Sequence, residues 1–435
     1  MNSLRTLLNR SRIFFIVWSM LAAFGTYFCM YAFRKPFNAG TYQGLYLGGF
    51  DYKIILIIAQ VFGYMLSKFI GIKVISELRP SQRKGLIIGL ILFAELSLIF
   101  FGLVPYPYNF VFLFLNGLPL GMVWGIVFSY LEGRRFTEVL GMGLCISLIV
   151  SSGILKTTYF MVHDWFPALS EFWLPALIGI LFLPLFLLFV WMLSVMPKPS
   201  EEDKSSRVER LPMTNADKRN VLRKYGWGIF SILLLYTMLA TMRDFRDNFS
   251  VEIWNQIDPS WNKAVFSETE SITGLIVLIA IASLSLIQSN LRGFRATLWL
   301  MASGLLISGG STLLFHIHML SPFWWMSLVG MGMFLAYIPV QVALFERMIA
   351  VFRIRANAGF FVYLCDSIGY LGSVMMLLYK EFFMKSMSWS KVLMQFSYLQ
   401  AAVGLMLIIT ASIFFARKSA SHRRAEESFE ELQSV

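Results

Sequence analysis

Twelve apolar runs dominate the sequence, and each is long enough to cross a lipid bilayer as a helix. A spanning helix needs about 20 mainly apolar residues. Of the 435 residues, 57% are hydrophobic and only 14% are charged, which leaves too little charge for the surface of a soluble protein. The predicted spans are 13–35, 53–73, 84–104, 110–131, 139–161, 173–196, 226–249, 268–288, 294–316, 322–345, 357–379 and 393–416. The sequence therefore predicts an all-α membrane protein with twelve transmembrane helices.

The longest polar connector, residues 197–225, divides these spans into six and six. This pattern is typical of two six-helix halves joined by a linker. We predict an N-terminal half at 1–196, a cytoplasmic linker at 197–225, a C-terminal half at 226–416 and a cytoplasmic tail at 417–435.

Lysine and arginine gather in alternate loops, which indicates the orientation of the chain in the membrane. The rich loops and the tail contain Lys73, Arg79, Arg83, Lys84, Arg134, Arg135, Arg292, Arg295, Arg347, Arg353, Arg355, Arg417, Lys418, Arg423 and Arg424, whereas the opposite loops contain Lys53, Lys263, Lys380, Lys385 and Lys391. We therefore expect both termini in the cytoplasm. The net charge of +12 follows from this topology, and we expect no nucleic-acid partner.

The sequence carries no motif for a cofactor or for catalysis. Cys29, Cys145 and Cys365 lie inside apolar runs without metal-ligand spacing, and neither HExxH nor GxSxG occurs. We expect no metal, no cofactor and no enzymatic activity.

Six basic residues lie inside predicted spans, where a charge at the helix centre costs about 2.5–3.5 kcal/mol even on a lenient scale. They are Arg34, Lys35, Lys68, Lys156, Arg243 and Arg246. A carboxylate, a wet cavity or an anionic ligand must compensate each of them. Because the spans contain fewer central carboxylates than cations, the imbalance favours an anionic substrate.

Tyrosines share a helical face with most of these charges. The groups are Tyr27, Tyr31 and Arg34; Tyr64 and Lys68; Lys156 and Tyr159; and Tyr363, Asp366 and Tyr370. A phenol donates a hydrogen bond beside the positive field of a cation, and a guanidinium matches phosphate or carboxylate oxygens. The Tyr27–Arg34 spacing recurs as Tyr236–Arg243 in the second half, as in transporters built from repeats.

Other interpretations of these residues stay open. Arg34 and Lys35 precede Pro36 and could also serve as anchors at the outer interface. Lys68 could also extend its side chain to the cytoplasmic interface. Arg243 and Asp247 have the spacing of an intrahelical ion pair.

The carboxylates within the spans are candidates for coupling transport to protons. Asp366 either carries a proton or neutralises Lys156 or Arg34, and Asp247 is a second candidate. Glu95 lies in an otherwise apolar run, so we expect it to be protonated or paired. Small residues at Gly85 and Gly89, and at Gly369 and Gly372, predict close helix packing.

Four stretches resemble one branch of the major facilitator superfamily, the organophosphate:phosphate antiporters that include glycerol-3-phosphate transporters. They are YFCMYAFRKPF (27–37), GYMLSKFIG (63–71), FFGLVPYPYNFVFLFLNGLPLGMVWG (100–125) and AGFFVYLCDSIGYLGS (358–373). The resemblance implies the major facilitator fold, a bacterial inner-membrane location and alternating access by two rocking halves.

The resemblance also implies site residues. Tyr27, Tyr31, Arg34, Tyr64, Lys68 and Trp124 would face the cavity, and Arg243 would be a second phosphate-clamping arginine. The chain departs from the family at Glu77 and Leu78, where the family has Asp-Arg, and near Val150, where the family has a histidine.

We therefore expect a monomeric secondary active transporter of an organic anion, with an organophosphate/phosphate antiporter as the specific form. A transporter-like sensor and a proton-coupled symporter of another solute are the alternatives. The predicted substrate-binding residues are Arg34, Arg243, Lys68, Lys156, Tyr27, Tyr31, Tyr64, Arg246 and Trp124, and the coupling candidates are Asp366 and Asp247.

Overall fold

The computed structural model describes residues 6–8, 10–76, 78–131, 137–197, 215–354, 356 and 358–433. Twelve helices in this part of the chain are long and apolar enough to cross a membrane, as the sequence predicts. Glu77, Arg134, Arg135, Arg355 and linker residues 198–214 lie outside the described residues.

The first half of the chain contains six spanning helices. Its elements are α2 (Arg12–Ala32), the 3₁₀ helix η1 (Pro36–Ala39), β1 (Tyr46–Leu47), β2 (Phe50–Asp51), α3 (Tyr52–Ser76), α4 (Arg83–Leu103), α5 (Phe110–Leu131), α6 (Thr137–Trp165) and α7 (Leu174–Val195). The two strands form a hairpin in which Tyr46 pairs with Asp51. Gly48 and Gly49 both have positive φ, which the tight two-residue turn requires.

The second half contains the other six spans. Its elements are α9 (Asn215–Asn248), α10 (Ser250–Ile257), α11 (Val265–Ser285), α12 (Asn290–His316), α13 (Pro322–Pro339), the π-helix η2 (Val340–Leu344), α14 (Phe345–Phe352), α15 (Ala358–Phe383) and α16 (Trp389–Gln433). The segment from α13 through α14 counts as one span, Pro322–Phe352.

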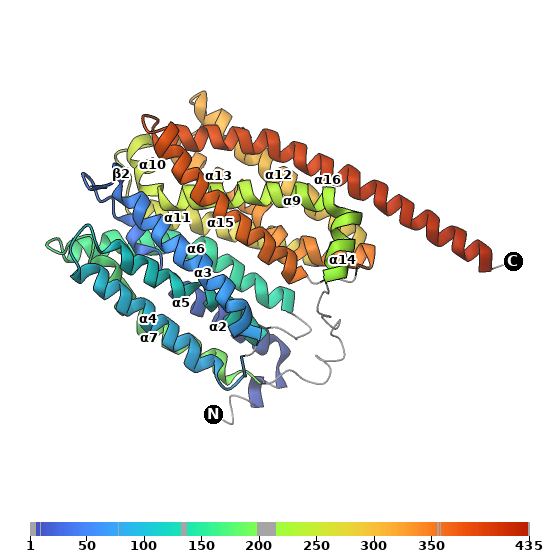
Figure 1. Cartoon of the computed structure of the whole chain (residues 1–435), viewed down its shortest axis with the longest axis horizontal. Helices are drawn as coiled ribbons and strands as arrows, with labels where there is room; N and C mark the ends of the chain where they lie inside the picture. The colour runs from blue at the N-terminus through green and yellow to red at the C-terminus, as the bar shows by residue number, and fades with distance from the viewer. Residues whose placement is uncertain are drawn as a thin grey trace. The chain divides into compact units, whose positions relative to one another are not determined.

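Two helices are longer than the hydrophobic pattern predicts. The helix α9 begins at Asn215, inside the predicted linker, and α16 continues to Gln433 through the predicted tail. Figure 1 shows α16 extending past the other helices of its unit toward the C-terminus. Both extensions contain several Lys and Arg and lack Gly and Pro, and the α16 extension is also rich in Glu, so both favour a helix outside the apolar spans as well.

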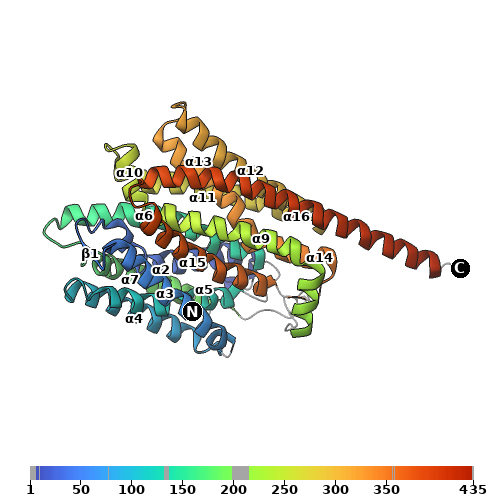
Figure 2. The ribbon, with the colours of Figure 1, turned by 45° about the horizontal axis from the view of Figure 1, so that its top comes forward.

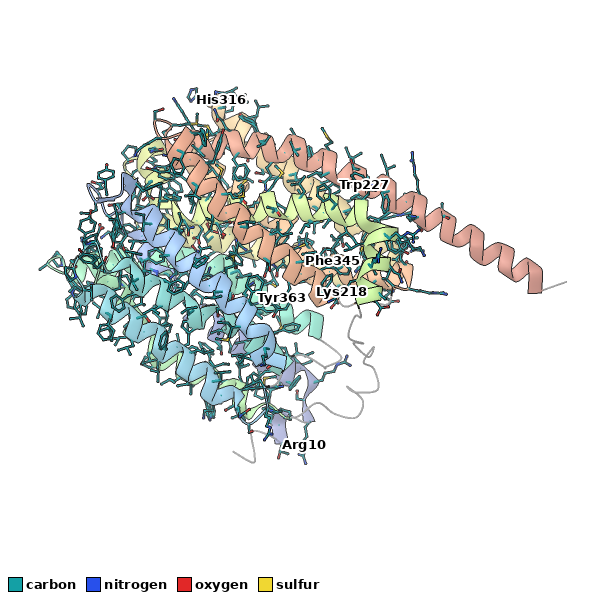
Figure 3. All side chains as sticks on the ribbon, viewed as in Figure 1. Arg10, Lys218, Trp227, His316, Phe345 and Tyr363 are labelled. Atoms are coloured by element: carbon teal, nitrogen blue, oxygen red, sulfur yellow. The ribbon has the colours of Figure 1, made fainter. Side chains whose placement is uncertain are left out.

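The contacts divide the chain into two compact units. Unit 1 comprises Met1–Arg207, Phe245–Leu278 and Val374–Ser390, and unit 2 comprises Val208–Asp244, Ile279–Ser373 and Lys391–Val435. Boundaries between the units fall inside α9, α11, α15 and α16. In unit 2, Figure 3 labels His316 at the end of α12 and Lys218 near the start of α9, at opposite ends of the unit.

In unit 1, the close approach of α3 and α5 depends on glycine. Figure 2 shows α3, α4 and α5 side by side in one bundle. A Cβ at Gly117 of α5 would overlap the carbonyl oxygen of Gln60 and lie 2.8 Å from the backbone nitrogen of Tyr64. A Cβ at Gly63 of α3 would likewise overlap the carbonyl oxygen of Phe114. The backbones therefore touch where α3 carries Tyr64.

The predicted packing role of Gly85 and Gly89 is wrong, because a Cβ at either position would meet no atom within 4 Å. Their face of α4 is open in the structure. Gly369 and Gly372 do pack closely, since their Cβ positions lie 3.0 Å from Cβ of Ala240 and 2.7 Å from Cγ2 of Thr237.

We predict that Gly117→Val lowers the thermal unfolding midpoint of the detergent-solubilised protein, because the added side chain forces α3 and α5 apart. Overpacking of this kind costs about 1–3 kcal/mol. The matched control is Gly89→Val, whose side chain enters open space. Equal midpoints for the two variants would show that the α3–α5 contact is not tight.

Candidate functional site

Arg34 lies just beyond the end of α2, in a turn that Pro36 helps to set. The helix ends at Ala32, and the backbone nitrogens of Arg34 and Lys35 both donate to the carbonyl of Tyr31, at 3.0 and 2.8 Å. The helix is thus one turn shorter than the predicted span 13–35, and Pro36, which has no backbone N–H, cannot continue its hydrogen-bond ladder. The turn leaves Arg34 within reach of the last tyrosines of α2.

Aromatic rings surround the Arg34 guanidinium in unit 1. Its Cζ lies 3.8 Å from the ring centroid of Tyr64 and 5.9 Å from that of Tyr31, and the side chain is 7% exposed. The ring of Tyr27 packs edge-on against Tyr31, with centroids 5.3 Å apart. Lys68 Nζ lies 5.6 Å from the same Tyr64 ring. The structure therefore brings five predicted site residues together.

This arrangement suits the recognition of an oxyanion. Cation–π contacts stabilise a buried guanidinium while its N–H edge stays able to donate to oxygen. Gln60 fixes the turn, since its Nε2 donates to the carbonyl oxygen of Arg34 at 2.9 Å. Trp124 is half-buried on α5 and stacks on Phe128, with centroids 5.1 Å apart.

Lys35 and Lys156 share one carboxylate in unit 1, that of Asp247. Lys35 Nζ forms an ion pair with Oδ2, and Lys156 Nζ lies 2.6 Å from Oδ1. Lys156 also donates to the Asp247 carbonyl oxygen at 2.7 Å and to Ser152 Oγ at 3.0 Å. Lys35 is therefore not a snorkelling anchor but part of a buried triad with a net charge of +1, from two ammonium groups and one carboxylate.

The triad changes the interpretation of Asp247. Two ammonium groups within ion-pair distance favour its charged form, which suits a fixed structural anion better than a proton carrier. The sequence spacing allowed an ion pair between Asp247 and Arg243, but Asp247 pairs with Lys35 and Lys156. Arg243 bonds to the adjacent Asp244 instead, at 2.7 Å.

Two further ion pairs of unit 1 were not apparent from the sequence. Arg246 NH1 lies 2.6 Å from Oε1 of Glu270 on α11. Lys53, which we expected near a loop, is 2% exposed and pairs with Glu252 of α10. Burial nevertheless raises the pKa of Glu252, because desolvation outweighs the attraction of Lys53.

In unit 2, Arg243 belongs to a polar cluster on α9, α13, η2 and α15. Its guanidinium stacks over the ring of Tyr337, 4.7 Å from the centroid, and bonds to the hydroxyl of that tyrosine. Ser373 Oγ donates to Asp244 at 2.8 Å. Arg243 thus combines an aromatic face, a phenol and a carboxylate.

Asp366 completes this cluster. Its Oδ1 accepts hydrogen bonds from the hydroxyl of Tyr236 and from Nε2 of Gln341, the latter at 3.0 Å. Tyr236 and Tyr337 are joined through their hydroxyls at 2.8 Å. Gln341 lies in the π-helical turn η2, and such turns are frequent at functional sites. Tyr337 carried no signal in the sequence, because an isolated tyrosine in an apolar run resembles ordinary packing.

We predict that Asp247→Asn lowers the unfolding midpoint strongly, because it leaves Lys35 and Lys156 buried without their carboxylate. Breaking a buried ion pair costs about 3–5 kcal/mol. The control is Asp164→Asn, which breaks the half-exposed pair with Lys263 and costs about 1 kcal/mol or less. The double variant Asp247→Asn/Lys35→Met should recover part of the loss. A midpoint for Asp247→Asn no lower than that of the control would contradict the triad.

The fold resembles that of solved transporters. One is a POT family transporter in complex with 5-aminolevulinic acid, with a TM-score of 0.56 and 13% identity over 92% of this chain and 96% of that chain. Another is a POT family transporter with a thioalcohol conjugated peptide, with a TM-score of 0.55 and 14% identity over the same shares. These likenesses confirm the predicted fold class, a twelve-helix membrane protein of the major facilitator type.

Comparison of the sequence with known protein families assigns the chain to one family. No curated protein matches the chain. One family model matches residues 36–418, which include α3 to α15 and the first part of α16. The chain therefore belongs to the family of unknown function DUF5690.

Proposed function

We propose that the protein is a secondary active transporter of an organic anion. The observation that carries the proposal is the buried guanidinium of Arg34, held in unit 1 between the rings of Tyr31 and Tyr64. The guanidinium fork matches carboxylate and phosphate oxygens, and an arginine inside a membrane protein commonly marks a substrate site.

Arg243 supports the same assignment from unit 2. Like Arg34, it stacks on a tyrosine ring, and it adds the hydroxyl of Tyr337 as a neighbouring polar group. We propose that Arg34 binds an oxygen of the anion in unit 1, where Tyr27, Tyr31 and Tyr64 orient the anion and Lys68 adds positive charge. We propose that Arg243 is an oxyanion-binding group of unit 2. Lys156 and Arg246 act indirectly, because Asp247 and Glu270 already pair with them.

Asp366 is the better of the two coupling candidates. As a carboxylate it accepts hydrogen bonds from Tyr236 and Gln341. A proton on Asp366 would turn this acceptor into a donor, and the phenol of Tyr236 can reverse its role in response. Proton binding would therefore rearrange the cluster that holds Arg243.

The substrate class follows from the same groups. The stretches around Arg34 and Lys68 resemble organophosphate:phosphate antiporters, so phosphate esters and inorganic phosphate are the first candidates, followed by carboxylates. We further propose that the protein lies in a bacterial inner membrane with both termini in the cytoplasm, as the basic loops indicate.

The test is uptake into proteoliposomes of labelled glycerol-3-phosphate, inorganic phosphate and a dicarboxylate. We predict that Arg34→Gln and Arg243→Gln each reduce uptake of the transported anion by at least about 30-fold, since losing a charged hydrogen bond to the ligand costs about 2–5 kcal/mol. The control is Arg295→Gln on the exposed face of α12. We expect this variant to keep its activity.

Full uptake by either arginine variant would overturn the assignment of that residue. Specific binding of an anion without flux, in protein that remains folded, would favour a sensor with the transporter fold instead.

A further inference from the structure

Glu95 is a buried carboxyl without a hydrogen-bonding partner. It lies in the middle of α4 and is 5% exposed, and neither Oε1 nor Oε2 has a hydrogen-bonding partner among the described residues. Buried polar groups are normally satisfied, so an orphaned carboxyl calls for an explanation.

A glycine makes room for this carboxyl. A Cβ at Gly179 of α7 would overlap Oε2 of Glu95 and would lie 3.1 Å from Cδ1 of Phe33. The Glu95 carboxyl therefore lies against the backbone of α7, beside the residue that precedes Arg34. Phe33 is anchored there as well, because its ring packs edge-on against Phe186 of α7, with centroids 5.9 Å apart.

The surroundings of Glu95 do not stabilise a negative charge. The sequences of α5 and α7 contain no Asp, Glu, Lys, Arg or His. The basic residues of α4 itself, Arg83 and Lys84, are at its start, and Arg12 is at the start of α2. Arg34 and Lys35, which follow α2, point to Tyr64 and Asp247. An unpaired buried carboxylate is costly, so Glu95 holds a proton in this conformation.

A pair of side-chain amides links Glu95 to the turn that carries Arg34. Asn116 Nδ2 donates to the carbonyl oxygens of Phe33 and Ala94, at 2.9 and 3.0 Å. Gln60 Nε2 donates to Asn116 Oδ1 at 2.8 Å and to the Arg34 carbonyl oxygen at 2.9 Å. One hydrogen-bond network thus holds the backbone next to Glu95 and the Phe33–Arg34 turn.

We propose that Glu95 is a proton-binding site coupled to the anion site at Arg34. Ionisation of Glu95 requires water or a cation beside the carboxyl, and the Phe33–Arg34 turn is the neighbouring segment that carries a cation. Loss of the proton therefore moves this turn, and movement of Arg34 on anion binding changes the affinity of Glu95 for its proton. The proposal rests on the proposed function and names the proton as a second ligand of the same cycle.

The first test reads the proton directly. Infrared difference spectroscopy of the purified full-length protein follows the carbonyl stretch of protonated carboxyls during a pH titration. We expect one band that disappears in Glu95→Gln, persists in the exposed control Glu268→Gln, and titrates while the protein remains folded. A Glu95 band that stays constant over the whole range in which the protein is folded would show a permanently protonated structural residue and overturn the proposal.

The second test separates coupling from binding. In proteoliposomes, Glu95→Gln removes the proposed proton site. Accumulation of glycerol-3-phosphate or phosphate driven by a pH gradient should therefore fall by about tenfold or more relative to exchange without a gradient in the same variant, within the usual range of coupling free energies. Unchanged gradient-driven accumulation would refute the coupling.

The two proposals fail in different ways. If none of the anions is transported by the wild-type protein, the proposed function fails, whereas the infrared titration still reports on Glu95. If Glu95→Gln does not fold, Gly179→Ala serves as the second variant, because its methyl group displaces the carboxyl without removing it. An infrared band unchanged in Gly179→Ala would contradict the close contact between the Glu95 carboxyl and Gly179.

Discussion

The cost of placing a charge in a low-dielectric membrane governs this structure. Among the described residues of unit 1, buried cations form ion pairs with carboxylates of other helices. Lys35 and Lys156 pair with Asp247, Lys53 pairs with Glu252, and Arg246 pairs with Glu270. Such pairs contribute little net stability compared with apolar residues, but breaking one is expensive. They fix which helix ends meet, and so they define the surroundings in which Arg34 is held by aromatic rings.

Close packing supplies the second requirement. Helices in lipid associate through small residues and interhelical hydrogen bonds, since lipid tails are as apolar as the side chains. In unit 1, Gly63 and Gly117 bring the α3 and α5 backbones into contact, and Asn116 and Gln60 join the turn that follows α2 to the middle of α4. Arg34 and Glu95, the residues of unit 1 proposed to bind the anion and the proton, are therefore positioned by the same set of packed helices.

The sequence predicts the spans and the local groupings well, but it does not predict partners on other helices. Hydrophobic runs define twelve helices, and the i, i+4, i+7 spacing correctly groups Tyr27, Tyr31 and Arg34. Periodicity shows which residues share a face of one helix and leaves the opposing helix unknown. The sequence therefore leaves an interface role open for Lys35 and does not indicate Glu270 as the partner of Arg246 or Tyr337 as the partner of Arg243. It also predicts packing at Gly85 and Gly89, on a face that is open in the structure.

We infer that the protein recognises its ligand chiefly by the negative charge of that ligand. The most direct measurement compares the affinities of the purified wild-type protein for glycerol-3-phosphate and for glycerol, by calorimetry at low and high ionic strength. We predict that the protein binds glycerol-3-phosphate, that salt weakens this binding, and that glycerol does not bind. Equal affinity for the anion and its neutral analogue, independent of salt, would contradict it.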